Sequence, residues 1–293
     1  MKNTDVKNLT PEEKWEQATI ANNYIFYKVM HENPDICKEL LEILLEMKID
    51  RIEIYQEKEL LAEFGKKGIR MDVYARGMDK SFDLEIQACD TGELPERARY
   101  YQGLMDTTQL ESGQDFKNLN SSYIIFICIP DIFKKGLGKY TFENLCLENP
   151  EIKLNDRAYK YFFIARNYDK LLNEQQKAFM KCMLSNESSS TFTEKIIRMV
   201  KNAKLNTQWR NSFMEFERQL AYSFREGKAE GKAEGMELGK AEGKAEGRDE
   251  KAVEASIEFL RKGIAPEIIA ECEKLPLEKV LELEKGIKKE ELC

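Results

Sequence analysis

The sequence predicts an α/β fold in which a mixed β-sheet core flanked by helices is followed by a helical C-terminal extension. Three observations predict it. Strand-like and helical segments alternate over residues 1–170, the pattern then becomes helical, and a glycine-spaced repeat sets off a last amphipathic stretch. With 293 residues, 42% of them hydrophobic, the chain can bury a sizeable core.

The N-terminal region, residues 11–47, has a helical pattern. Asn33 can cap a helix, Pro34 suits its first turn, and Asp35 complements the helix dipole. One apolar stripe then follows at helical spacing, made of Ile36, Cys37, Leu40, Leu41, Leu44 and Leu45. We expect this stripe to pack in the core.

Six strand-like segments come next, at residues 51–56, 69–76, 81–89, 123–129, 139–145 and 160–166. A helix lies between the third and fourth, with Pro95 near its start and Ala98, Tyr101 and Met105 at helical spacing. A strand, a hairpin, a helix and another buried strand predict a mixed sheet flanked by helices. Residues 1–170 are therefore expected to form the core, and residues 171–225 a helical extension.

A tandem repeat occupies residues 226–250, with glycine at 227, 231, 235, 239, 243 and 247. Each glycine costs an isolated helix about 1 kcal/mol relative to alanine. The four-residue spacing also places lysine over lysine and glutamate over glutamate. The repeat is either a solvated, partly helical linker or a helix whose small residues let two chains approach closely. Its excess of acids excludes a basic DNA-binding arm.

The last segment, residues 251–293, regains an amphipathic pattern, and two short helices are expected to open near Pro266 and Pro276. A helix-turn-helix that reads DNA would need basic residues clustered on its second helix, and this segment lacks them. A small packing or oligomerisation module is favoured. We expect a homo-oligomer assembled through the repeat and these helices.

The composition of the chain limits the kinds of catalysis and binding that it can carry out. A net charge of −7 argues against a surface that binds nucleic acid indiscriminately, and the single histidine, His31, all but excludes catalytic triads and histidine-ligated metals. The seven cysteines form no CxxC pair and look like reduced packing residues. The N-terminus has no apolar signal core, and the longest apolar run, residues 123–129, is far short of the roughly 20 residues that span a bilayer. A cytoplasmic location without membrane contact is expected.

The stretch GIRMDVYARGMDKSFDLEIQ, residues 68–87, carries acids on two alternating segments. A hairpin closed symmetrically between Arg76 and Ser81 pairs residues whose numbers sum to 157, and paired residues project to the same face. The pairs placed on one face are Asp72 with Glu85, Tyr74 with Asp83, and Arg70 with Gln87. The other face is apolar, so a one-residue slip of register would bury the acids and expose the hydrophobic residues.

Directly opposed Cβ atoms lie about 4.5–5.5 Å apart, so the carboxylates of Asp72 and Glu85 repel unless a positive charge lies between them. A hard divalent cation, Mg²⁺ or Mn²⁺, meets that need. It would polarise a phosphodiester and acidify a bound water that Gln87 orients. Acids on a solvent-facing strand are a common alternative. The cross-strand placement, the strict alternation and the lack of other catalytic groups favour phosphodiester hydrolysis.

Motifs over residues 19–166 carry a resemblance to a known family. NNYIFYKVM, GIRMDVYA, FDLEIQ, LPERARYYQGLMD, SSYIIFICIPDIF and YTFENLC occur in this order. The set resembles the PD-(D/E)XK nuclease family transposases, the group that includes the recombination-promoting nucleases. The repeat and the helical C-terminus also look like that family's ending. The resemblance implies a restriction-endonuclease-like core, metal-dependent DNA endonuclease activity, and a role in recombination or in defence against foreign DNA.

Carried over by residue, the family's metal-binding aspartate falls on Asp72 and its glutamate on Glu85. The glutamine that replaces the lysine of the wider superfamily falls on Gln87. Neutral glutamine removes a positive charge, so the metal must supply more of the electrostatic stabilisation. The family often has an aspartate where this chain has Asn23, and a glycine where it has Arg157. The alternative is therefore a catalytically weak or inactive DNA-binding or assembly protein that retains the nuclease fold.

DNA is the expected partner. In ERARYYQ, Arg97 and Arg99 can contact phosphates and Tyr100 can stack on a base, while Arg70 can neutralise backbone charge. An equally good interpretation places Tyr101 in the core and pairs Arg97 and Arg99 with nearby acids, and for Arg70 a solvated loop is the plainer account. A further alternative is that the C-terminal segment, by oligomerising or by covering the cleft, keeps a nuclease silent.

Overall fold

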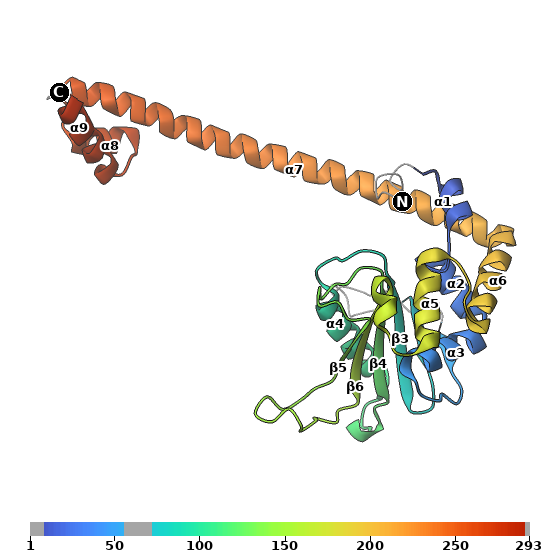
Figure 1. Cartoon of the computed structure of the whole chain (residues 1–293). Coiled ribbons are helices and arrows are strands. Elements are labelled where there is room, and N and C mark those ends of the chain that lie inside the picture. Colours follow the sequence, from blue (N-terminus) through green and yellow to red (C-terminus); the bar gives the residue numbers. More distant parts are fainter. Residues whose placement is uncertain (1–8, 56–71, 291–293) are drawn as a thin grey trace. The chain divides into compact units, whose positions relative to one another are not determined.

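The computed structural model describes residues 9–55 and 72–290 (Figure 1). The chain divides into two compact units, Met1–Phe216 and Glu217–Cys293. The expected boundary near residue 170 falls inside the first unit, because the helices that follow it pack on the same core as the sheet. Arg70, an expected DNA contact, lies outside the described residues.

A six-stranded sheet runs through the described part of the first unit in the order β1-β2-β3-β4-β6-β5. β1, β2 and β3 are antiparallel, β3, β4 and β6 are parallel, and β5 is antiparallel to β6. The strands are β1 (Glu53–Tyr55), β2 (Val73–Arg76), β3 (Lys80–Gln87), β4 (Ser121–Cys128), β5 (Lys139–Phe142) and β6 (Ala158–Ile164). All six lie within or close to the segments expected from the sequence, and the mixed sheet is confirmed.

The hairpin of β2 and β3 has the predicted register. Tyr74 pairs with Asp83 and Arg76 with Ser81, so paired numbers sum to 157. The reason is the alternation along β3, where every second residue is apolar and buried against helices. The predicted side-chain faces of β3 are therefore confirmed.

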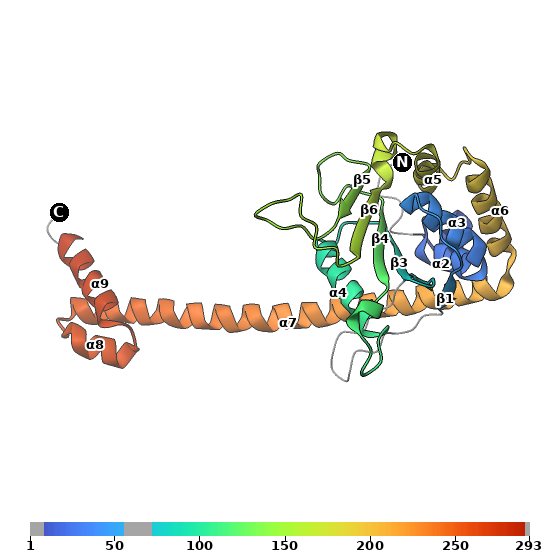
Figure 2. The same cartoon turned by 90° about the horizontal axis from the view of Figure 1, so that it is seen from below.

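One face of the sheet packs on five helices, most of which Figures 1 and 2 show together on one side. They are α1 (Pro11–Gln17), α2 (Asn23–Glu32), α3 (Pro34–Leu45), α5 (Glu174–Ser185) and α6 (Thr191–Leu205). Thr10 caps α1 through a capping box with Glu13, and Asn22 caps α2. The apolar stripe expected on α3 is buried except for Leu45, which is partly buried, and it belongs to the same core cluster as the apolar side chains of β3.

The other face packs on α4 (Leu94–Thr107), which connects the parallel strands β3 and β4. Ala98, Tyr101 and Met105 of α4 join Phe126 and Phe162 of the sheet in a second core cluster. Short 3₁₀ helices, η2 (Phe116–Asn118) and η3 (Ala165–Lys170), precede β4 and follow β6. The acid-bearing face of β3 therefore lies towards α4 and not towards solvent.

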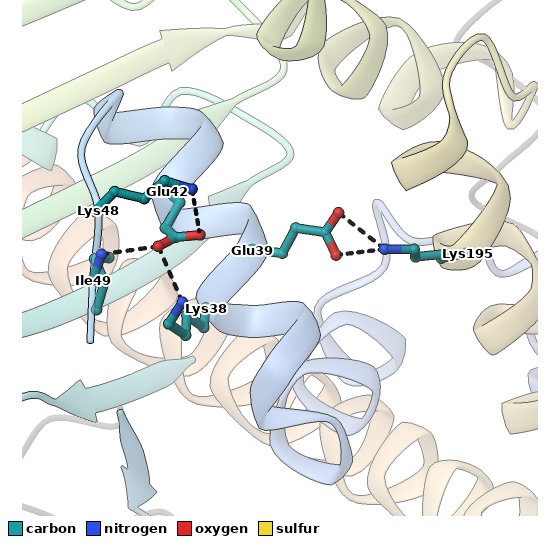
Figure 3. A network of polar contacts seen from close by, with 6 residues as sticks. All are labelled: Lys38, Glu39, Glu42, Lys48, Ile49 and Lys195. Carbon is teal, nitrogen blue, oxygen red and sulfur yellow. Dashed lines mark hydrogen bonds and ion pairs between the residues drawn. The ribbon is translucent and has the colours of Figure 1, made fainter. Parts of the chain in front are cut away.

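A polar network links α3 to its neighbours (Figure 3). Lys195 of α6 contacts Glu39 at 2.8 Å, while Glu42 accepts hydrogen bonds from Lys38 at 3.0 Å and from the Ile49 backbone N–H at 2.9 Å. The Ile49 hydrogen bond is the main cause that lowers the pKa of Glu42. These residues line a cleft of about 660 Å³. Because Glu39 and Glu42 are paired with lysines, we interpret the polar contacts in this cleft as a solvated structural network.

In the second unit the glycine repeat is helical in this structure. It lies within α7 (Thr207–Arg261), a continuous helix of 55 residues. A small core of Ile269, Leu275 and Val280 joins the end of α7 to α8 (Pro266–Glu273) and α9 (Leu277–Glu290). Over the residues that the structure describes, no helix has the length and apolar character needed to cross a membrane.

Candidate active site

Asp72 and Glu85 meet across the β2–β3 hairpin, as the register predicts. The backbone N–H of Asp72 donates to a Glu85 carboxylate oxygen at 2.8 Å. In return, the Asp72 carboxylate accepts a hydrogen bond from the backbone N–H of Ile86 at 3.0 Å. Each acid is thus held by the backbone beside the other, which fixes both carboxylates at one place on the sheet.

Glu85 is buried and its second carboxylate oxygen pairs with an arginine. The side chain is 2% exposed, and Nη2 of Arg97 lies 3.3 Å from this oxygen. Burial raises the pKa of Glu85 well above its ordinary value, and the charges of Asp83 and Asp72 raise it further. The positive charge of Arg97 opposes this rise of the Glu85 pKa. Arg97 is therefore the cation that faces the Glu85 carboxylate in this structure.

Arg97 is held firmly in that position. Its guanidinium donates to the Tyr101 hydroxyl at 3.0 Å and lies over the rings of Tyr101 and Phe126, at 5.3 and 5.7 Å from their centroids. Of the two interpretations given to the arginines of this helix, pairing with a nearby acid is the one that holds for Arg97. Arg99 and Tyr100 are exposed on α4, away from the Glu85 contact.

Asp83 is an acid of the site to which the sequence analysis gave no role. It is fully buried on the same face as Glu85, and within the described ranges neither of its carboxylate oxygens has a hydrogen-bond partner. Burial, and then the charge of Asp72, raise the pKa of Asp83 well above its ordinary value. The signal was present in D-x-E-x-Q, but Tyr74 and not an acid faces Asp83 across the hairpin.

Gln87 and Asn23 complete the surroundings. Gln87 ends β3, is 8% exposed, and shares the face of Glu85 because residues two apart on a strand project to the same side. The side-chain amide of Asn23, in the first turn of α2, donates to the Ile86 carbonyl at 3.4 Å. The position at which the family often has an aspartate therefore lies next to the β3 residues of the site.

The donor set fits a hard divalent cation. Carboxylate oxygens, such as those of Asp72 and Glu85, are the ligands that Mg²⁺ and Mn²⁺ prefer, and the carboxyl group of Asp83 lies buried on the same face with no hydrogen-bond partner among the described residues. Among residues 9–55 and 72–290, no three Asp, Glu, His or Cys side chains form a ready-made metal cluster. Oxygens of Asp72 and Glu85 are engaged by backbone N–H groups and by Arg97, and a bound cation would compete with these contacts.

Comparison with known proteins gives one match. The family model described as PD-(D/E)XK nuclease family transposase matches residues 21–229, which is more than half of the chain. Searches of curated proteins and of solved structures find no match. The matched range contains the whole sheet, α4 and every residue of the candidate site.

Proposed function

We propose, because the chain belongs to the PD-(D/E)XK nuclease family transposases, that it is a metal-dependent endonuclease that hydrolyses phosphodiester bonds in DNA. One observation carries the proposal. The Asp72 backbone N–H donates to Glu85 at 2.8 Å and the Ile86 backbone N–H donates to the Asp72 carboxylate at 3.0 Å, beside the buried Asp83, whose carboxyl oxygens have no hydrogen-bond partner among the described residues. Three acids placed close together on a buried face lower the stability of the fold. A bound cation would offset that cost.

In this proposal Asp72 and Glu85 hold Mg²⁺ or Mn²⁺. The bound cation supplies Lewis acidity, which polarises the phosphodiester and makes a water more acidic. Gln87 donates a hydrogen bond from its side-chain amide to the attacking water or to a phosphate oxygen. Asp83 lies on the same face as the two ligands, and a cation bound beside it would favour its charged form.

Arg97 takes the part that a lysine plays elsewhere in the superfamily. Gln87 brings no charge to the end of β3, whereas the guanidinium of Arg97 lies 3.3 Å from Glu85 and comes from α4 instead. A planar, permanently charged group in this place can bind a phosphate and stabilise the charge that develops in the transition state. Arg99 and Tyr100, exposed on the same helix, are proposed to contact DNA further from the cut.

The family description and the resemblance support a role in recombination or in defence against foreign DNA. We also propose a homo-oligomer assembled through α7, α8 and α9. Apolar side chains on α7, among them Leu220, Tyr222 and Phe224, are more than half exposed. Burying them between copies of the chain would stabilise the long helix.

A second function is favoured by a specific observation. Glu85 is 2% exposed and paired with Arg97, and the chain has Asn23 where the family often has an aspartate and Gln87 where the wider superfamily has a lysine. These features suit a DNA-binding or assembly protein that keeps the fold without cleaving DNA.

Incubation of the full-length protein with supercoiled plasmid and Mg²⁺ or Mn²⁺ separates the two functions. Nicking is expected, and Asp72→Asn and Glu85→Gln should each slow it by at least about 100-fold, as loss of transition-state stabilisation does. Asp169→Asn, an exposed acid on η3, is the matched control and should nick as the wild type does. Plasmid that is retained by the protein but not cut with either cation would support the second function.

A further inference from the structure

A cavity of about 270 Å³ opens on the α4 side of the sheet. Its lining includes three phenylalanines and Pro95, with Lys160 and Asn144 as polar groups. Phe162 of β6 is 1% exposed and forms the floor, whereas Phe142 at the end of β5 is 43% exposed. The cavity, which we call the aromatic pocket, is therefore open to solvent beside an aromatic ring.

The rings of the aromatic pocket are arranged as a floor and two walls. Phe133 and Phe142 each stand nearly perpendicular to Phe162, at 90° and 86°, with centroids 5.1 and 5.8 Å away. The two wall rings lie 5.3 Å apart. The three rings contact one another, so a flat molecule does not enter between them and would instead lie against the exposed side of Phe142, in the offset-stacked or edge-to-face geometry of aromatic contacts.

The polar groups limit what this box can hold. Lys160 is partly buried and donates to the side-chain oxygen of Gln102, and burial lowers the pKa of its ammonium group. A cation in the wall opposes a cationic guest of the kind that aromatic cages usually bind. At the mouth, the Asn144 side-chain amide donates to Asp156 at 2.6 Å and the Glu143 carboxylate pairs with Lys153 at 2.6 Å, so a ligand that binds either residue shares or displaces these contacts.

The cross-strand register ties the aromatic pocket to the acids. Glu85 on β3 pairs with Phe126 on β4, and Phe126 pairs with Phe162 on β6. The pocket floor is therefore two strand spacings from Glu85, about 10 Å, on the same face of the sheet. Arg97 lies over Phe126, between the acids and the pocket, and Pro95 belongs to the same turn of α4.

We propose that the aromatic pocket receives an unstacked base of a DNA strand whose backbone lies at Asp72 and Glu85. The inference rests on the proposed nuclease function and adds to it a preference for single-stranded or locally unpaired DNA. A base has the flat shape that the rings accept and the polar edge that Asn144 and Lys160 can meet. Its distance from the acids suits a nucleotide close to the scissile phosphate.

The test is the affinity of the full-length protein for a labelled single-stranded oligonucleotide, measured by fluorescence anisotropy in Ca²⁺. Stacking of one base on aromatic side chains contributes about 1–3 kcal/mol, so Phe142→Ala should weaken binding by about 5- to 150-fold. Phe142→Leu keeps the apolar volume but not the ring, and it should weaken binding in the same direction. Phe116→Ala, which removes an 81% exposed ring from η2, is the matched control and should bind as the wild type does.

A set of oligonucleotides with one abasic site at successive positions sharpens the test. One position should reproduce the loss of affinity in the wild type and cause no further loss in Phe142→Ala, because base and ring then belong to one contact. Circular dichroism checks that each variant is folded. If Phe142→Ala is not folded, the abasic series on the wild type alone tests whether one base binds in the aromatic pocket.

The possible results distinguish failure of the pocket proposal from failure of the nuclease proposal. If the wild type nicks plasmid and binds the oligonucleotide, but neither Phe142 variant nor any abasic site changes affinity, the aromatic pocket has no base and the nuclease proposal stands. If the wild type neither binds nor cuts DNA, the proposed function fails and the pocket proposal fails with it.

Discussion

The two faces of β3 are equally buried and chemically opposite. Towards the five helices, Phe82, Leu84 and Ile86 are at most 1% exposed, whereas towards α4 the residues between and after them, Asp83, Glu85 and Gln87, are at most 8% exposed. Burying one large apolar side chain stabilises a fold by about 1.5–3 kcal/mol, but burying an unpaired carboxylate costs several kcal/mol. The comparison teaches that one face of β3 stabilises the fold, whereas the other buries acids at a cost in stability, which is what the proposed cation site would explain.

The largest stability effect is expected on the apolar face. Phe82→Ala removes a fully buried ring from the core cluster and should lower the free energy of unfolding by about 3–5 kcal/mol. Chemical denaturation followed by circular dichroism measures this. Phe116→Ala is the exposed control, with an expected change within about 0.5 kcal/mol. A loss below about 1 kcal/mol for Phe82→Ala would mean that this face does not stabilise the fold as described.

On the acid face, breaking the ion pair should cost less. Arg97→Gln leaves the buried carboxylate of Glu85 without its cation, and we expect a loss of about 3 kcal/mol or less, because Arg97 itself is partly solvated. Adding Glu85→Gln to the same chain should recover much of that loss, since no buried charge then remains unpaired. If the double variant is as unstable as Arg97→Gln, the ion pair is not the source of the effect.

Asp83→Asn should act in the opposite direction from Phe82→Ala. A carboxyl whose pKa is raised by folding binds more protons in the folded state, so stability is fully present below the ordinary pKa of about 4 and falls as the pH rises towards the folded-state pKa. Asparagine carries no charge at any of these pH values. In the absence of divalent cations, unfolding measured from pH 4 to 8 should therefore show a shallower decline for Asp83→Asn, and a gain of about 1–3 kcal/mol at the upper end. Identical slopes for the two proteins would contradict this.

Gly235 of α7 serves as the reference for both faces of β3. We expect the smallest change in stability there. A Cβ on Gly235 would meet no described atom within 4 Å outside the helix's own backbone. Gly235→Ala should therefore stabilise α7 by about 0.5–1 kcal/mol through backbone entropy alone. Sedimentation of the full chain adds a second reading. An oligomer that dissociates in this variant would show that the glycines allow close approach of two helices.

The sequence predicted the apolar face and the register well, because both follow from strict alternation. A one-residue slip at Asp72, Tyr74 or Glu85 would reverse every side chain of the hairpin, so the pattern allows only one pairing. The contact between Asp72 and Glu85 follows from the same rule. The continuous helix through the repeat was left open, since the helix propensity of glycine argues against it.

What alternation could not predict is what covers each face. Polar residues on a strand suggest solvent, and only the parallel crossover from β3 to β4 places α4 over Asp83 and Glu85. The pairing of Arg97 with Glu85 depends on that placement. The aromatic pocket was missed for a related reason, because its walls come from segments that meet only when β5 and β6 pair.

The central claim is that Asp72 and Glu85 together hold a hard divalent cation. Titration of Mn²⁺ into the full-length protein, followed by electron paramagnetic resonance, counts bound ions directly and does not depend on cleavage. We predict a site that is present in the wild type and in Asp169→Asn and is lost in Asp72→Asn and in Glu85→Gln. Equal binding in all four proteins, or no binding in the wild type, would contradict the account.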